Sequence, residues 1–264
     1  MPSNPKFSGL HPAAIALLIP LGALVLWRSA YPVTPWAVVL WLAPAFVVAQ
    51  GSYQRTRTFK RVWREAVWHP NSFVARWLTG RLAALWKAGI AVVVTLPVLA
   101  HLSLTGNATT LIALVVVALS AFGLSAVLGR GVQRQTAPAL VLPVATRLAW
   151  WIAGAVGSGL VFTISLFWTP LPDYLDAAGW GETLALIRDQ IPGHGGPVAW
   201  LMATLSTFEA MSYLLAREEA RLVASPFLLI FQLVYDALAA FSFARLGADA
   251  AMHLRSGDNA VETG

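Results

Sequence analysis

Seven predominantly apolar stretches alternate with short polar segments along the chain. They are residues 10–27, 31–50, 85–104, 108–128, 148–168, 198–216 and 227–244. A helix rises about 1.5 Å per residue and the hydrocarbon core is about 30 Å thick, so about 20 residues make one crossing. Because lipid offers no partner to backbone N–H and C=O groups, each crossing must be helical. The pattern predicts an all-α bundle of about seven transmembrane helices, or six, since the first and sixth windows fit least well.

The composition agrees with a membrane environment. Hydrophobic residues make up 58% of the 264 residues, charged residues make up 11%, and the mean hydropathy is +0.67. A soluble domain averages about 45–50% apolar and about 25% charged residues. We therefore expect one integral membrane domain over residues 1–246 and a polar, disordered tail over 247–264. Cysteine is absent, which excludes disulfides, thiolate metal sites and cysteine nucleophiles.

The positions of lysine and arginine predict the orientation. The formal charge is +6, and most of the 18 cations fall on one side if the N-terminus is cytoplasmic. The predicted outer loop, residues 169–197, carries several carboxylates instead. These features favour a bacterial inner (cytoplasmic) membrane, with the N-terminus inside and, for seven spans, the C-terminus outside.

A basic segment, residues 51–87, separates the second and third windows. Its part "QRTRTFKRVWREAVWHP" (54–70) places Phe59 and Trp63 on one face of a helical wheel. The opposite face carries Arg57, Lys60, Arg61 and Arg64. This pattern predicts an amphipathic helix that starts after Arg55 and lies in the plane of the membrane surface.

Three uses fit this helix. It can bind a bilayer with anionic headgroups, dock a cytoplasmic partner such as another membrane subunit, or bind nucleic acid. We favour the lipid surface, because about 1 kcal/mol per surface cation is sufficient for binding. Nucleic acid fits least, because the bilayer takes the apolar face and the sequence has no recognition fold.

Two carboxylates lie well inside apolar windows: Glu209 in the sixth and Asp236 in the seventh. An ionised group at the bilayer centre costs at least about 2.5–3.5 kcal/mol, so each must face the bundle interior, be paired or be protonated. Tyr213 lies one turn after Glu209, and Gln232 lies one turn before Asp236. The two acids are interpreted either as a proton or cation relay or as a structural pair of buried acids.

Small residues recur in the fifth window, in "AGAVGSG". Ala153 and Gly157 are four residues apart, as are Gly154 and Ser158. Small side chains at this spacing let two helices approach closely. The motif predicts a helix contact, either within the bundle or with a partner.

Tryptophans fall at or near the ends of the apolar windows. They are Trp27, Trp36, Trp150, Trp151, Trp168 and Trp200. An indole prefers the headgroup level, where its ring is half apolar and its N–H reaches water. We therefore expect these side chains to form the aromatic belts of the two membrane interfaces.

The sequence carries no motif of a known family, and we expect no catalytic site, cofactor or metal. The favoured function is a non-enzymatic subunit, scaffold or assembly and docking factor of a membrane complex. The alternative is a proton- or cation-coupled transporter of small solutes that uses Glu209 and Asp236.

Overall fold

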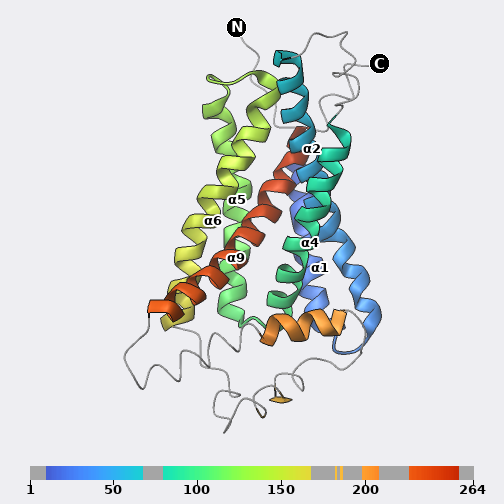
Figure 1. Ribbon diagram of the computed structural model, residues 1–264, viewed down its shortest axis with the longest axis vertical. Helices are drawn as coiled ribbons and strands as arrows, with labels where there is room; N and C mark the ends of the chain where they lie inside the picture. Colours follow the sequence, from blue (N-terminus) through green and yellow to red (C-terminus); the bar gives the residue numbers. More distant parts are fainter. Residues whose placement is uncertain are drawn as a thin grey trace.

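The regular elements in the described part of this protein are helices. A computed structural model describes residues 10–67, 80–167, 182, 185–186, 198–207 and 226–255 (Figure 1). Five helices in it are long and apolar enough to cross a membrane: α1 (Leu10–Ala30), α2 (Leu42–Val67), α4 (Arg81–Thr105), α5 (Ala108–Val132) and α6 (Val141–Phe167). The predicted all-α fold is therefore confirmed for the described residues, with five candidate membrane spans.

The predicted number of seven spans is not confirmed. In the sixth window the described residues form one short apolar helix, Val198–Thr207, which lies across the end of the bundle (Figure 1). The seventh window falls in α9 (Pro226–Ala251), which is 26 residues long but is not one of the five candidate spans. This helix runs obliquely through the bundle and packs against all five of them.

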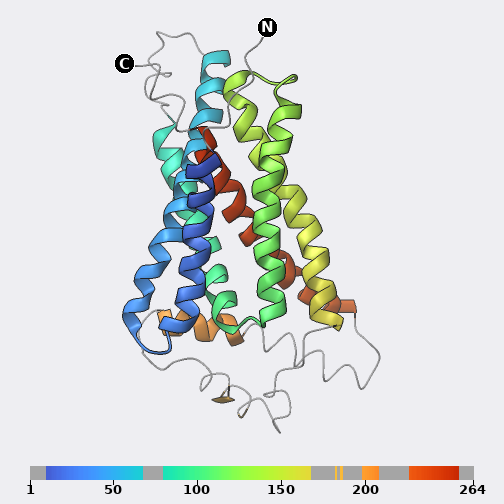
Figure 2. The same ribbon diagram turned by 180° about the vertical axis from the view of Figure 1, so that it is seen from behind.

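The helices alternate in direction, so the start of α1 and the end of α9 lie at the same end of the bundle (Figures 1 and 2). This arrangement corrects the expectation of termini on opposite sides, because α9 returns the chain to the end from which it started. Every described lysine and arginine except Arg28 belongs to this end or to the half of a helix nearest to it. We call it the basic end.

The predicted in-plane amphipathic helix is not a separate element. Residues 54–67 continue α2 without a break, and the helix already includes Arg55. The sequence between Ser52 and Val67 contains neither proline nor glycine, and its many Arg, Lys and Glu residues favour helix. Nothing in this stretch ends the second span, so it extends past the apolar window.

The chain also stays helical beyond the boundary expected at Gly247. Helix α9 continues to Ala251 and is followed by the short 3-10 helix η4 (Met252–Arg255). Asp249, which we placed in a disordered tail, has no exposed surface. The low hydropathy of this stretch comes partly from charged groups that are paired inside the protein.

Close packing of α6 against α9 and α5 depends on glycines. A Cβ atom added at Gly154 would lie 2.4 Å from the ring of Phe241, and one at Gly157 would lie 2.6 Å from Val117. Ala153 and Ser158 are also buried, and the Ser158 Oγ donates to the Gly154 carbonyl at 2.6 Å. The small residues of the fifth window therefore lie at a contact within the bundle.

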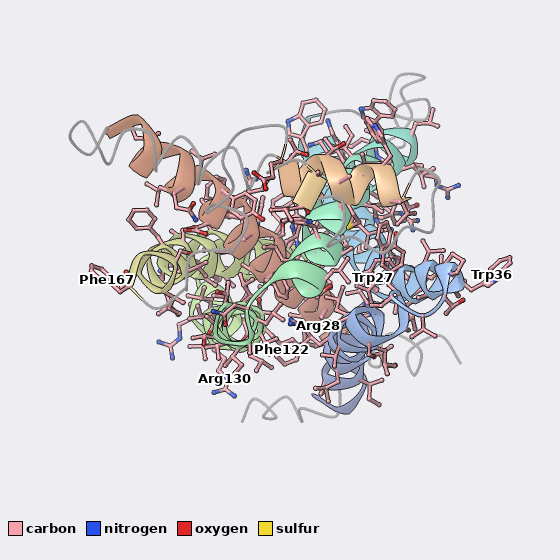
Figure 3. All side chains as sticks on the ribbon, turned by 90° about the horizontal axis from the view of Figure 1, so that it is seen from below. Trp27, Arg28, Trp36, Phe122, Arg130 and Phe167 are labelled. Carbon is pink, nitrogen blue, oxygen red and sulfur yellow. The ribbon has the colours of Figure 1, made fainter. Side chains whose placement is uncertain are left out.

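Trp27 corrects the expectation that all the tryptophans lie in the membrane interfaces. It is fully buried, its Nε1 donates to the Ala100 carbonyl at 3.1 Å, and its ring stacks on Tyr31. Trp36 is 78% exposed and points away from the bundle (Figure 3). The side chain of Met202, on the short helix, completes the core around Trp27.

Candidate functional site

A buried ionic cluster joins α2 to α9 at the basic end. The Arg55 Nη2 donates to Asp249 Oδ1, and the Arg245 Nε lies 3.5 Å from Oδ2. The Ser52 Oγ donates to the same Oδ2 at 3.4 Å and accepts from the Arg245 Nη2 at 2.9 Å. We call these four residues the Asp249 cluster.

Gly51 allows the two backbones to meet at this cluster. A Cβ atom at Gly51 would lie 2.5 Å from the Cβ and 2.7 Å from the Cα of Asp249. Because any larger residue would push α9 away from α2, the glycine sets the distance over which Ser52 and Arg55 reach the carboxylate. A buried charge is tolerated only when it is paired and hydrogen-bonded, and this close approach supplies both.

The cluster carries more positive than negative charge. Its two guanidinium groups share one carboxylate, so its formal charge is +1. The Arg245 guanidinium also lies over the Trp150 ring, 5.3 Å from its centroid, in a cation–π contact. Burial lowers the pKa of nearby His253, although Asp249 opposes the shift.

A cavity of about 450 Å³ opens beside the cluster, between α2, α4 and α6. Its lining combines cations with aromatic rings: Arg55, Thr56, Phe59, Lys60, Trp63, Lys87, Arg147 and Trp150. A second cavity of about 210 Å³ shares Arg55, Thr56 and Lys87 and leads to Ser52 and Arg245. No described carboxylate lines either cavity, so both are strongly positive.

The predicted docking residues lie on two sides of α2. Arg57, Lys60 and Arg61 are exposed, and Arg61 pairs with Glu65 at 3.5 Å. Arg64 is partly buried. Phe59 and Trp63, the predicted apolar face, line the 450 Å³ cavity, and the Lys60 Nζ lies 5.7 Å from the Trp63 ring centroid. Phe59 and Trp63 therefore lie at an open cavity beside α4 and α6, and Trp63 is still 53% exposed.

Asp236 is buried among polar neighbours in α9. The Gln232 Nε2 donates to Asp236 Oδ2 at 3.1 Å, and the Ser165 Oγ of α6 donates to Oδ1 at 3.2 Å. The structure thus brings together Gln232 and Asp236, as the spacing predicts, and adds Ser165. Glu209 and Tyr213 lie outside the described residues.

Sequence reasoning missed Asp249, Arg245 and Ser52. A signal was available, because Arg245 and Asp249 are four residues apart and so lie on one face of a helix. It was hidden because the apolar window ends at residue 244 and the next residues look like the start of a tail. The partner charge, Arg55, comes from a distant segment, and no local pattern connects the two.

Comparison with protein-family models, with curated proteins and with solved structures finds no match to this chain.

Proposed function

We propose that this protein is a non-enzymatic subunit, scaffold or assembly factor of a membrane complex, and that its basic end docks an acidic surface of a partner subunit. The observation that carries the proposal is the exposed cationic face on the last turns of α2, formed by Arg57, Lys60 and Arg61. Helix α2 extends beyond the ends of α4 and α9 at this end (Figure 2). Arg57 and Arg61 are exposed on this helix, and Lys60, also exposed, lies beside Gly80 at the start of α4.

The direction of α2 supports a protein partner over the lipid surface. A helix that lies on a bilayer buries its apolar face in the headgroup region. In this protein the side chains of Phe59 and Trp63 line an open cavity beside α4 and α6, with Trp63 53% exposed, and the helix continues a membrane span. Complementary charge across an interface mainly speeds association and selects the partner, which suits a docking role.

The positive-inside rule supports a cytoplasmic location of the basic end. Arg28, at the end of α1, is the exception among the described cations, and its Nη1 donates to the Gly106 carbonyl at 2.7 Å. With this orientation the docking face projects into the cytoplasm, and both the start of α1 and the end of α9 are cytoplasmic. A bacterial inner membrane fits this charge pattern.

Reversing the charge of Arg57 and Arg61 together should remove the partner. We expect the wild-type protein, purified in mild detergent, to retain a stoichiometric subunit, and the R57E/R61E variant to lose it. The control is R130E/R134E, which makes the same change in net charge at the same end. Arg130 lies in the last turn of α5 and points outward (Figure 3), and Arg134 lies in the turn after this helix. Equal loss from both variants, or no partner on the wild type, would contradict the proposal.

The second candidate function is a coupled transporter, and it rests on Asp236. A carboxylate that is 3% exposed and held by Gln232 and Ser165 is the kind of group that proton relays use. Such a role requires a water path to the carboxylate. The two cavities at the basic end are lined by other residues, so they do not provide that path.

A further inference from the structure

We propose that the 450 Å³ cavity between α2, α4 and α6 binds a phosphate group carried by an amphiphile, such as an anionic lipid headgroup. The site overlaps the docking face at Lys60, which lines the cavity, whereas Arg57 and Arg61 do not line it. It requires no catalytic step, only recognition of a negatively charged group and of the apolar part attached to it.

The first reason for proposing a phosphate site is that the positive charges lining the cavity are not neutralised. Lys87 of α4 and Arg147 of α6 line the same cavity as Arg55 of α2. Within the described part of the chain, Lys87 and Arg147 form no ion pair and no hydrogen bond through their side chains. The nearby carboxylate of Asp249 is already shared by Arg55 and Arg245. Like charges gathered in one cavity repel one another, and a bound anion would remove that repulsion.

The second reason is that one of these cations is fixed in place. Arg55 is only 8% exposed, and Asp249 holds one edge of its guanidinium. Its buried Nε has no hydrogen-bond partner among the described residues. A planar guanidinium is suited to phosphate oxygens, and little entropy is lost when it is already ordered. The hydroxyl of Thr56, on the same lining, can supply a further donor.

The aromatic part of the lining indicates an amphiphile. Phe59, Trp63 and Trp150 border the cavity together with the cations. Ligand pockets have volumes of about 300–1,000 Å³, so the 450 Å³ cavity can hold a headgroup with part of its attached chain. Three aromatic rings would add nothing to the binding of a bare inorganic ion.

The position of the cavity along the helices agrees with a lipid as the source of the phosphate group. Lys87 and Arg147 each lie in the second turn of a membrane-spanning helix, counted from the basic end. That is roughly the depth of the headgroups, where tryptophan is also favoured. Basic pockets between transmembrane helices on the cytoplasmic side are typical binding sites for anionic lipid headgroups.

The test is equilibrium binding to the purified full-length protein in mild detergent, followed by intrinsic tryptophan fluorescence. The probes are short-chain phosphatidic acid, short-chain phosphatidylcholine and inorganic phosphate. We expect saturable binding of phosphatidic acid, at least tenfold weaker binding of inorganic phosphate, and none of phosphatidylcholine. If inorganic phosphate binds as tightly as phosphatidic acid, the lipid source is wrong.

Variants of the lining residues test whether phosphatidic acid binds in the cavity. We expect K87Q/R147Q to weaken phosphatidic acid binding at least tenfold. Because both side chains are exposed, the fold should persist in this variant. Circular dichroism can verify that it does. The matched control, R130Q/R134Q, removes two cations from the same end outside the cavity and should bind like the wild type. Equal loss in both variants, or no loss in K87Q/R147Q, would overturn the site. Retention of the partner subunit is a separate readout, so this proposal can fail while the docking function stands.

Discussion

The D249N variant is expected to lose about 3–5 kcal/mol of folding stability, the usual cost of breaking a buried ion pair by removing one partner. Asparagine keeps the shape of the side chain but removes the charge that Arg55 and Arg245 share. Arg55, which is 8% exposed, would then hold a largely buried charge without its partner. The loss should appear as a lower unfolding temperature of the protein in detergent.

Asp236 provides the control for this substitution. It lies in the same helix and is almost as buried, and the neutral groups of Gln232 and Ser165 each donate a hydrogen bond to it. We expect D236N to lower the unfolding temperature much less than D249N. Adding R55Q to D249N should recover part of the loss, because one uncompensated charge disappears. A D249N protein as stable as D236N would show that the Asp249 cluster does not hold α2 against α9.

The G247A variant is expected to destabilise the bundle by about 1–3 kcal/mol or more, the range for overpacking a tight core. A Cβ atom at this position would lie 2.0 Å from the carbonyl oxygen of Ala118 and 2.8 Å from its carbonyl carbon. These are backbone atoms of α5, so no side chain can move aside to relieve the contact. Helix α9 would have to shift away from α5, and the adjacent Asp249 cluster would shift with it.

Gly123 supplies the matched control, because it lies on α5 and a Cβ atom added there meets nothing within 4 Å. We expect G123A to be neutral or to stabilise the protein by up to about 1 kcal/mol, since alanine favours helix more than glycine does. The unfolding temperatures of G247A and G123A test this predicted difference in stability. If G247A is as stable as G123A, the close contact between α9 and α5 is absent in solution.

The apolar helices could be predicted because hydropathy depends only on the residues within each window. Windows of high hydropathy require only the residues within them, and five of the seven windows lie in helices that can cross a membrane. The helix contact at Gly154 and Gly157 could also be predicted from the sequence, because the spacing of small residues places them on one helix face. The same spacing could not say whether that face meets α9 or another protein.

The buried ion pair was not predictable, because it joins segments 194 residues apart. Arg55 departed from the amphipathic wheel of its neighbours and was therefore left outside the predicted helix. In the structure it lies inside α2, on the side that faces Asp249 of α9. A residue that breaks a local pattern can thus belong to a long-range pairing, which hydropathy alone cannot reveal.

Hydropathy also failed to predict where two helices end at the basic end. Hydropathy predicted that α2 ends near Gln50 and that the last helix ends near Ala244, yet they continue to Val67 and Ala251. Both extensions carry charged residues, which lower the hydropathy although the backbone remains helical. The candidate site is built from these two extensions, and for that reason it lay outside the predicted spans.

The central claim is that the basic end faces the cytoplasm and includes both the start of α1 and the end of α9. The natural chain contains no cysteine, so single cysteines can be labelled without background. The most direct measurement is labelling of intact cells with a membrane-impermeant maleimide at Val33→Cys, at Gln135→Cys and at a cysteine added after Gly264. Val33 is 80% exposed at the end opposite to the basic end, and Gln135 is exposed between α5 and α6. We predict labelling at Val33→Cys alone, with the other two labelled only after the cells are opened. Labelling of the C-terminal cysteine in intact cells would contradict the account.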